Sequence, residues 1–334
     1  MRRLAALLCV ALGLAASSAA LAADAPAPFT KLLKYVQTIK DMDRAYAFYL
    51  SLGLEPQGPP SAEKKLADNP GVARLTGSPA GTQFRNAFLK VPGADFQFEF
   101  TEFAGLEQKA IRPRMQDPGA SLLVLRVRDI AKTIEIARKG GAEIVTLGGA
   151  PLPIGPQGKT RIVFLRDPEG YFVELVDASS AGADAPSGNI VGASFASVVE
   201  DAKKAGEYYR DHFGLEARFA EPVANGNDVR VVGLEKGQFE RSTVTVPGSN
   251  VSWMFVSYGK VEKKAYAPRV TDPGAPAIGI QTRNFDGVLA AYKGSGGTVV
   301  SADGEAFRPG GNAIIFVRDP FGLLVEVNQP APPK

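Results

Sequence analysis

The sequence has almost none of the residues that form disulfides or bind transition metals through nitrogen or sulfur. Its 334 residues include one cysteine and one histidine. Cys9 lies inside an apolar N-terminal run, and no second cysteine exists to pair with it within the chain. His212 lies on the apolar stripe of a predicted helix, where a core or helix-end role is expected. A disulfide-stapled fold is excluded, and so is a metal site built from several imidazoles or thiolates of one chain.

A strong excess of either charge is also absent. The chain has 38 Lys and Arg residues against 35 Asp and Glu residues, without a basic run or a stripe of alternating basic and aromatic residues. Nucleic acids and anionic membranes are therefore not expected as partners. No glycine-rich loop leads into a helix, so no phosphate-binding loop is predicted either.

The only long apolar run is at the N-terminus. Met1-Arg2-Arg3 precedes an apolar segment over 4–14, and small residues follow up to Ala20-Leu21-Ala22. This order predicts a secretory signal peptide at 1–22, with a retained signal anchor as the alternative. The predicted mature chain contains no cysteine, and it is expected in the periplasm or as a secreted protein without stable membrane anchoring.

Turn motifs recur at one constant spacing along the chain. Val91-Pro92-Gly93 returns as Val246-Pro247-Gly248, and Asp117-Pro118-Gly119 returns as Asp272-Pro273-Gly274, both 155 residues later. Agreement at a single offset indicates two homologous repeats. The predicted organisation is a first domain at 31–178, a linker at 179–189 rich in small residues, and a second domain at 190–329. Each domain is expected to contain two strand–helix–strands units, with helices that begin after Asp41, Asp129 and Asp201 and a further short helix over 62–75.

Two short hairpins place an acid among apolar neighbours. RIVFLRDPEGYFVELVD at 161–177 and NAIIFVRDPFGLLVEVN at 312–328 both read as strand, Asp-Pro-x-Gly turn and strand. Glu174 and Glu326 lie inside the second strands, where a carboxylate is costly unless it has a partner. Both glutamates are therefore candidate site residues.

Three phrases together resemble a known family: KDMDRAYAFYLSLGLE at 40–55, VRDIAKTIEIARKGGAEIV at 127–145 and RDPEGYFVEL at 166–175. They are similar to the vicinal oxygen chelate superfamily, which includes glyoxalase I, extradiol dioxygenases and bleomycin-resistance proteins. The resemblance implies an α+β fold of tandem paired βαβββ modules that form cup-shaped mixed sheets. It also implies that metal-dependent members hold a divalent ion with ligands from the first and last strands of each module.

The positions that correspond to these ligands carry few metal-binding groups here. In the first domain they are Lys34, Glu99, Leu122 and Glu174, and in the second they are Ser194, Met254, Ala277 and Glu326. No cofactor is therefore expected, and the alternative is a divalent cation at Glu99 and Glu174. We expect Lys34 to replace the metal and to pair with Glu99 and Glu174, since a cation between two carboxylates favours their ionised forms.

The direction of the first strand decides this hypothesis. If Tyr35 and Gln37 face the cup instead of Lys34, Gln37 becomes the polar group of interest. A buried ion pair without chemistry, a ligand site and a carboxylate acting as a general base remain open at this point. Among the other residues, Phe96, Phe98, Phe100 and Phe103 are expected in the core or the cup wall. Trp253 and Tyr258 are expected in the core, with the wall of a pocket in the second domain as the alternative. Arg114 and Arg269 are expected to form salt bridges with nearby acids.

The sequence favours an exported protein that binds a small, partly apolar molecule without a metal, with Lys34, Glu99, Glu174 and Glu326 as ligand-binding residues. One alternative is a lyase, isomerase or oxygenase of the glyoxalase or dioxygenase type, which would use Glu99 and Glu174 as catalytic residues. The other is a structural or partner-binding module. A small-molecule ligand is the expected partner, and the chain is expected to be a monomer or a homodimer.

Overall fold

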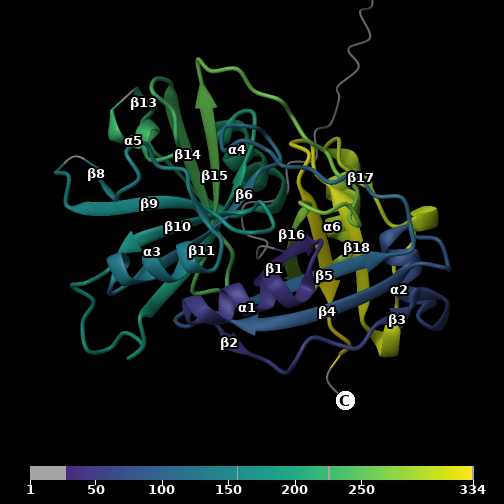
Figure 1. Ribbon diagram of the computed structural model, residues 1–334. Coiled ribbons are helices and arrows are strands. Elements are labelled where there is room, and N and C mark those ends of the chain that lie inside the picture. The colour runs from purple at the N-terminus through teal and green to yellow at the C-terminus, as the bar shows by residue number, and fades with distance from the viewer. Residues whose placement is uncertain (1–27, 156, 225, 333–334) are drawn as a thin grey trace, which may run out of the picture.

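The computed structural model describes residues 28–155, 157–224 and 226–332 (Figure 1). The predicted signal peptide at 1–22 lies outside these residues. Within the described part of the chain, no helix is both long enough and apolar enough to cross a membrane.

Four modules of similar design follow one another, each with a strand, a helix and then further strands. The first module contains β1 (Phe29–Ile39), α1 (Met42–Leu52), β2 (Glu55–Pro56), β3 (Lys64–Lys65), α2 (Pro70–Thr76), β4 (Gln83–Lys90) and β5 (Gln97–Ala104). The second contains β6 (Ser121–Val127), α3 (Ile130–Lys139), β7 (Glu143–Ile144), β8 (Leu152–Ile154), β9 (Thr160–Arg166) and β10 (Phe172–Asp177).

The second repeat supplies the other two modules. The third contains β11 (Ile190–Val198), α4 (Ala202–Phe213), β12 (Glu216–Phe219), β13 (Val223–Ala224), α5 (Asn227–Arg230), β14 (Gln238–Thr245) and β15 (Ser252–Gly259). The fourth contains β16 (Pro276–Thr282), α6 (Phe285–Gly294), β17 (Thr298–Val299), β18 (Ala313–Arg318) and β19 (Leu324–Gln329).

The main helices begin where the sequence predicts. Asp41, Asp129 and Asp201 each accept a hydrogen bond from the backbone N–H three residues later, which satisfies a free donor of the first turn. The helix predicted over 62–75 is wrong in extent: α2 begins only at Pro70, after a short strand and a 3₁₀ turn. Proline suits the first turn of a helix, where its missing N–H costs nothing, and the helix starts there.

The two repeats exchange strands. The first sheet has the order β17-β18-β19-β16-β1-β5-β4-β2, so it joins the first module to the fourth. The second sheet has the order β12-β14-β15-β11-β6-β10-β9-β7, so it joins the third module to the second. Antiparallel pairs β1–β16 and β6–β11 form the two junctions. The predicted mixed, open sheets are thus confirmed, but each sheet takes one module from each repeat (Figure 1).

Helices hold the modules of one repeat together. Helix α1 packs on α3, and α4 contacts α6. The hydroxyl of Tyr49 on α1 donates to Asp167 in the Asp-Pro-x-Gly turn of the second module, at 2.7 Å. In the second repeat Tyr209 donates to Asp319 at 2.9 Å. Strand pairing therefore crosses the repeats, whereas these buried side-chain bonds stay within them.

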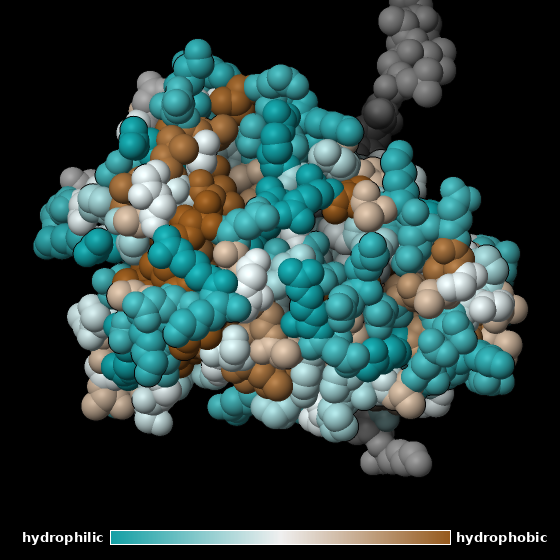
Figure 2. Space-filling view, in the orientation of Figure 1, coloured by the Kyte–Doolittle hydropathy of each residue, from teal (hydrophilic) through white to brown (hydrophobic). Residues whose placement is uncertain are grey.

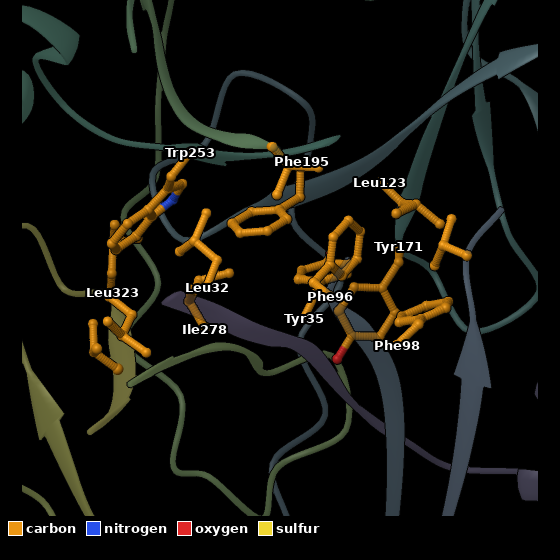
Figure 3. Packing of buried hydrophobic residues seen from close by; sticks show 14 of the residues in the cluster. Leu32, Tyr35, Phe96, Phe98, Leu123, Tyr171, Phe195, Trp253, Ile278 and Leu323 are labelled. Carbon is orange, nitrogen blue, oxygen red and sulfur yellow. The ribbon is translucent and has the colours of Figure 1, made fainter. Parts of the chain in front are cut away.

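The main core lies between the two sheets (Figure 3). The ring of Tyr35 stacks on Phe98 of its own sheet and on Phe195 of the other, with centroids 5.4 and 5.6 Å apart. The hydroxyl of Tyr171 donates to the carbonyls of Thr38 and Ala275, so its buried polar atom is satisfied. Such contacts fix one sheet against the other and leave the opposite face of each sheet free for a site.

Several smaller predictions can be compared with this core. Phe96, Phe98, Phe100 and Trp253 are buried in it, and Phe103 belongs to a small separate cluster. Arg114 and Arg269 form ion pairs with Asp117 and Asp272, as predicted. His212 is exposed in the last turn of α4 and contacts the ring of Tyr208, so only the helix-end part of its predicted role is right.

Candidate functional site

The outer face of the first sheet holds an internal ion pair. Lys34 Nζ lies 2.8 Å from Glu99 Oε2 and 3.0 Å from Glu326 Oε1, and the three side chains are 18, 9 and 6% exposed. Lys34 therefore faces this cup, while Tyr35 and Gln37 point into the core on the other side of β1. We call this face the Lys34 cup.

The Lys34 side chain has space because a glycine lies beside it. Lys34 is opposite Gly279 in the β1–β16 register, and a Cβ at Gly279 would come 2.4 Å from Lys34 Cγ. Small apolar residues, Ala275 and Ala277 among them, surround this region in a cluster that Leu75 of α2 joins. The Lys34 cup is thus filled by the chain's own side chains.

Electrostatics agree with a closed ion pair. Burial lowers the pKa of the Lys34 ammonium, but the attraction of Glu326 and Glu99 outweighs it, so the pKa lies above its usual value. Burial also raises the pKa of Glu99, an effect that the charge of Lys34 opposes. Each buried charge has a partner, which avoids the large cost of an isolated one.

The outer face of the second sheet holds an open cavity instead. Its volume is about 460 Å³, within the range typical of small-molecule pockets. We call this face the Glu174 cup. Most of its wall is apolar, and its apolar lining includes Met115, Leu122, Val124, Ile162, Phe164, Val176, Ala196, Val231, Val232, Phe239, Met254 and Val256. Hydrophobic side chains gather in the left half of Figure 2, over β9, β10, β14 and β15 of Figure 1.

Several polar groups on the cavity wall have no hydrogen-bond or ion-pair partner among the described residues, including the Glu174 carboxyl, the Ser194 hydroxyl and the Tyr258 hydroxyl. Burial raises the pKa of Glu174 to about 7, and the charge of Arg241 opposes this only in part. Burial, with Glu174 nearby, also holds the pKa of Tyr258 well above its usual range. These groups can accept or donate hydrogen bonds to a bound molecule.

Register shows that the two cups are built from corresponding positions. Glu326 lies opposite Gly279 and Phe316, as Glu174 lies opposite Val124 and Phe164. On β1, the strand partner of Glu99 lies two residues after Lys34. On β11, the strand partner of Met254 lies two residues after Ser194 in the same way. The Lys34 cup therefore holds Lys34, Glu99, Ala277 and Glu326, and the Glu174 cup holds Ser194, Met254, Leu122 and Glu174.

Comparison with known proteins agrees with this architecture. The sequence model of the Glyoxalase/Bleomycin resistance protein/Dioxygenase superfamily matches residues 31–175 and 193–327. The chain belongs to this superfamily.

Solved structures of glyoxalase-superfamily proteins share the fold of this chain at low sequence identity. Glyoxalase I from Zea mays is 19% identical, with a TM-score of 0.58, over 90% of this chain and 92% of that one. A putative dioxygenase from Bacillus subtilis is 15% identical, with a TM-score of 0.53, over 92% of this chain and 87% of that one. Comparison with curated protein sequences gives no match.

The metal-ligand positions expected for this superfamily do not suit a divalent ion here. In the Lys34 cup an ammonium group occupies the space between the two carboxylates. In the Glu174 cup one carboxylate faces a serine, a methionine and a leucine, whereas hard cations need several oxygen ligands. No group of three or more His, Cys, Asp or Glu residues that could hold a metal ion occurs among the described residues.

The structure separates residues that the sequence analysis had placed together. Lys34 contacts Glu99 as expected, but its second partner is Glu326, and Glu174 lies on the other sheet. The predicted Lys34–Glu174 pairing is wrong, because strands pair across the repeats and place Glu99 and Glu174 on different sheets. A catalytic role or a bound cation at either glutamate stays a prediction.

Two cavity residues carried little signal in the sequence. Tyr258 was expected in the core more than in a pocket, and Ser194 was only a substitute at a ligand position. Both line the Glu174 cup. The alternation of side chains along a strand could have placed Ser194, Met254 and Tyr258 on the same face of their strands. Which other strands complete that face could not be known before the sheet order was known.

Proposed function

We propose that this protein is exported and that it binds a small, partly apolar molecule in the Glu174 cup without a metal ion. The observation that supports the proposal is a cavity of about 460 Å³ with apolar walls and an unpartnered carboxyl group. Apolar walls supply most of the binding free energy, and a few polar groups orient the ligand. The Lys34 cup has a structural role, because its own ion pair fills it.

The chain can complete both sheets by itself, because each sheet takes one module from each repeat. We therefore expect a monomer to be able to bind, with a homodimer as the alternative assembly. The N-terminal segment at 1–22 supports export to the periplasm or the medium.

Methionine methyl groups offer a direct test. Met115 and Met254 line the cavity, whereas Met42 is buried in the main core. In protein labelled with ¹³C at the methionine methyls, apolar fragments should shift the signals of Met115 and Met254 and leave Met42 unchanged. Native mass spectrometry of protein exported with its own leader should show a bound molecule, which dialysis against a chelator should not remove.

A matched pair of variants locates the binding. Ser194→Phe places a ring in the cavity and should abolish the shifts. Ser252→Phe makes the same change in a neighbouring groove on β15, outside the cavity, and should leave them. Undiminished binding by Ser194→Phe would contradict the proposed site, and loss of binding after chelation would contradict metal independence.

A further inference from the structure

The Lys34 cup shows which chemical group fits against the glutamate of the last strand. There the partner of Glu326 is a primary ammonium group on an alkyl stem, with Lys34 Nζ 3.0 Å from Glu326 Oε1. The stem crosses Gly279, and the side chain of Phe316 lies next to Glu326 in the sheet register. The cup thus already contains an alkylammonium ligand that belongs to the chain.

The Glu174 cup lacks that group and has a cavity beside its glutamate. Ser194 stands where the other cup has Lys34, so the alkyl stem and the ammonium are missing. Glu174 has no hydrogen-bond or ion-pair partner among the described residues, and the charge of Arg241 offsets the effect of its burial only in part. A carboxylate in such a place is stabilised by a cation that enters with the ligand.

Resting on the binding function proposed above, we infer that the Glu174 cup takes an apolar primary amine, whose ammonium group binds Glu174 at the position that the Lys34 side chain fills in the other cup. The aromatic residues Phe164, Phe239 and Tyr258 line the same cavity and offer ring faces to a cation and to its apolar body. The ligand class is therefore an amine with a hydrocarbon or aromatic body.

Other charged groups of the cavity determine its pH behaviour. Arg126 on β6 and Arg241 on β14 line it, as do Glu221 and Asp228 near its α5 side. Of these, Arg241 is the one that acts on Glu174. Ionisation of Glu174 around pH 7 should govern amine affinity. The affinity should rise about tenfold from pH 6 to pH 8, because the ionised fraction of a carboxyl with a pKa of about 7 grows from roughly one tenth to roughly nine tenths over that range.

The test uses the full chain with matched probes. Hexylamine and benzylamine are compared with 1-hexanol and benzyl alcohol, which have the same bodies without the charge. We expect the amines to bind at least tenfold more tightly at pH 8, by titration of the Met115 and Met254 methyl signals. Glu174→Gln should remove that preference, a loss of about 10- to 100-fold for a buried charge-assisted hydrogen bond, and should leave alcohol binding almost unchanged.

A double variant converts one cup into the other. Ser194→Lys supplies the internal ammonium, and Val124→Gly gives its stem the space that Gly279 gives Lys34. Ser194→Lys/Val124→Gly should lose amine binding because its own lysine occupies Glu174. Val124→Gly alone should keep the preference for amines, which controls for the change in the cavity wall.

The outcomes separate the two proposals. Equal affinity for amines and alcohols, or a preference for amines that survives Glu174→Gln, would overturn the amine inference and leave the binding function intact. Failure of every probe to shift Met115 and Met254 at millimolar concentration would overturn both.

Discussion

In the Lys34 cup the glutamate of the last strand contacts a lysine of the same chain, whereas its counterpart in the Glu174 cup faces a cavity. The two faces share strand order and register, and Glu99 and Ala277 of one cup correspond to Met254 and Leu122 of the other. Lys34 and Gly279 in one cup correspond to Ser194 and Val124 in the other. A small number of side chains thus decides whether the same scaffold fills its own cup or leaves it open to a ligand.

The largest effect is expected from removing the internal cation. Lys34→Met leaves Glu99 and Glu326 buried and close together without a counter-charge, which should destabilise the fold by about 3–5 kcal/mol at neutral pH. Burial already raises the pKa of Glu99, and without Lys34 its charge no longer has an opposing partner, so the loss should grow as the pH rises above about 5. Chemical denaturation across pH measures it.

A surface lysine serves as the control for that variant. Lys31, also on β1, is 36% exposed and its ion pair with Asp95 spans 3.7 Å, so Lys31→Met should cost about 1 kcal/mol or less. Ligand binding to the Glu174 cup should survive in both variants. Equal stability of the two variants would show that the internal ion pair contributes nothing.

One substitution should have opposite signs in the two cups. Glu326→Gln weakens the contact with Lys34 and should destabilise the fold by about 1–3 kcal/mol. Glu174→Gln removes an unpartnered carboxylate and should stabilise it at high pH. The folded-state pKa of Glu174, about 7, lies above the model-compound value of 4.5, so the wild-type protein loses stability as the pH rises from about 4.5 to about 7, and the loss is complete above pH 7.

The pH profile of unfolding distinguishes the members of this pair. Above pH 7, Glu174→Gln should be more stable than the wild type by on the order of 3 kcal/mol, because the pKa of Glu174 is raised from 4.5 to about 7 and one pKa unit corresponds to about 1.4 kcal/mol. The difference should shrink as the pH falls toward 5. A destabilising effect of Glu174→Gln at pH 8 would mean that this carboxylate already has a favourable partner.

Filling the space beside the Lys34 side chain should have a smaller effect on stability. Gly279→Val places a side chain where Lys34 Cγ already lies, so Lys34 must move away from its two carboxylates. The expected cost is about 1–3 kcal/mol, as for overpacking elsewhere. Gly192→Ala on β11 is the matched control, because a Cβ there meets only Arg126 Cδ at 3.6 Å. Thermal unfolding of the two variants should differ clearly.

The smallest effect concerns a feature that the two repeats share. Tyr49→Phe and Tyr209→Phe each remove the hydroxyl that donates to a buried Asp-Pro-x-Gly aspartate. Each should cost about 1–2 kcal/mol, by similar amounts, since the geometry is repeated. Markedly unequal losses in denaturant titrations would show that the two repeats differ in their helix anchors as well as in their cups.

Local features of this fold could be read from the sequence, because their causes are local. Asp41, Asp129 and Asp201 begin helices by accepting N–H groups three residues away. The Asp-Pro-x-Gly hairpins close where proline and glycine allow the turn. The contact between Lys34 and Glu99 could be predicted because both belong to one module, in which β1 and β5 pair, although the face of β1 on which Lys34 lies was left open.

The choice of partner module could not be read in this way. The four modules have similar strands, and no residue near β6 marks whether β1 or β11 should pair with it. The observed pairing depends on contacts far apart in sequence, such as Tyr35 stacking on Phe195. The ion pair between Lys34 and Glu326 is also a contact between residues far apart in the sequence. Predicting it would have required testing Lys34 against the acids of both repeats.

Strand exchange also bears on how the two halves of the molecule depend on each other. A protease that cut the chain between residues 179 and 189 would leave both fragments joined along the β1–β16 and β6–β11 seams and by the rings between the sheets. Neither fragment contains all the strands of either cup, so dissociation of the fragments would disrupt the Lys34 cup and the Glu174 cup together. One repeat without the other would therefore lack a complete ligand site.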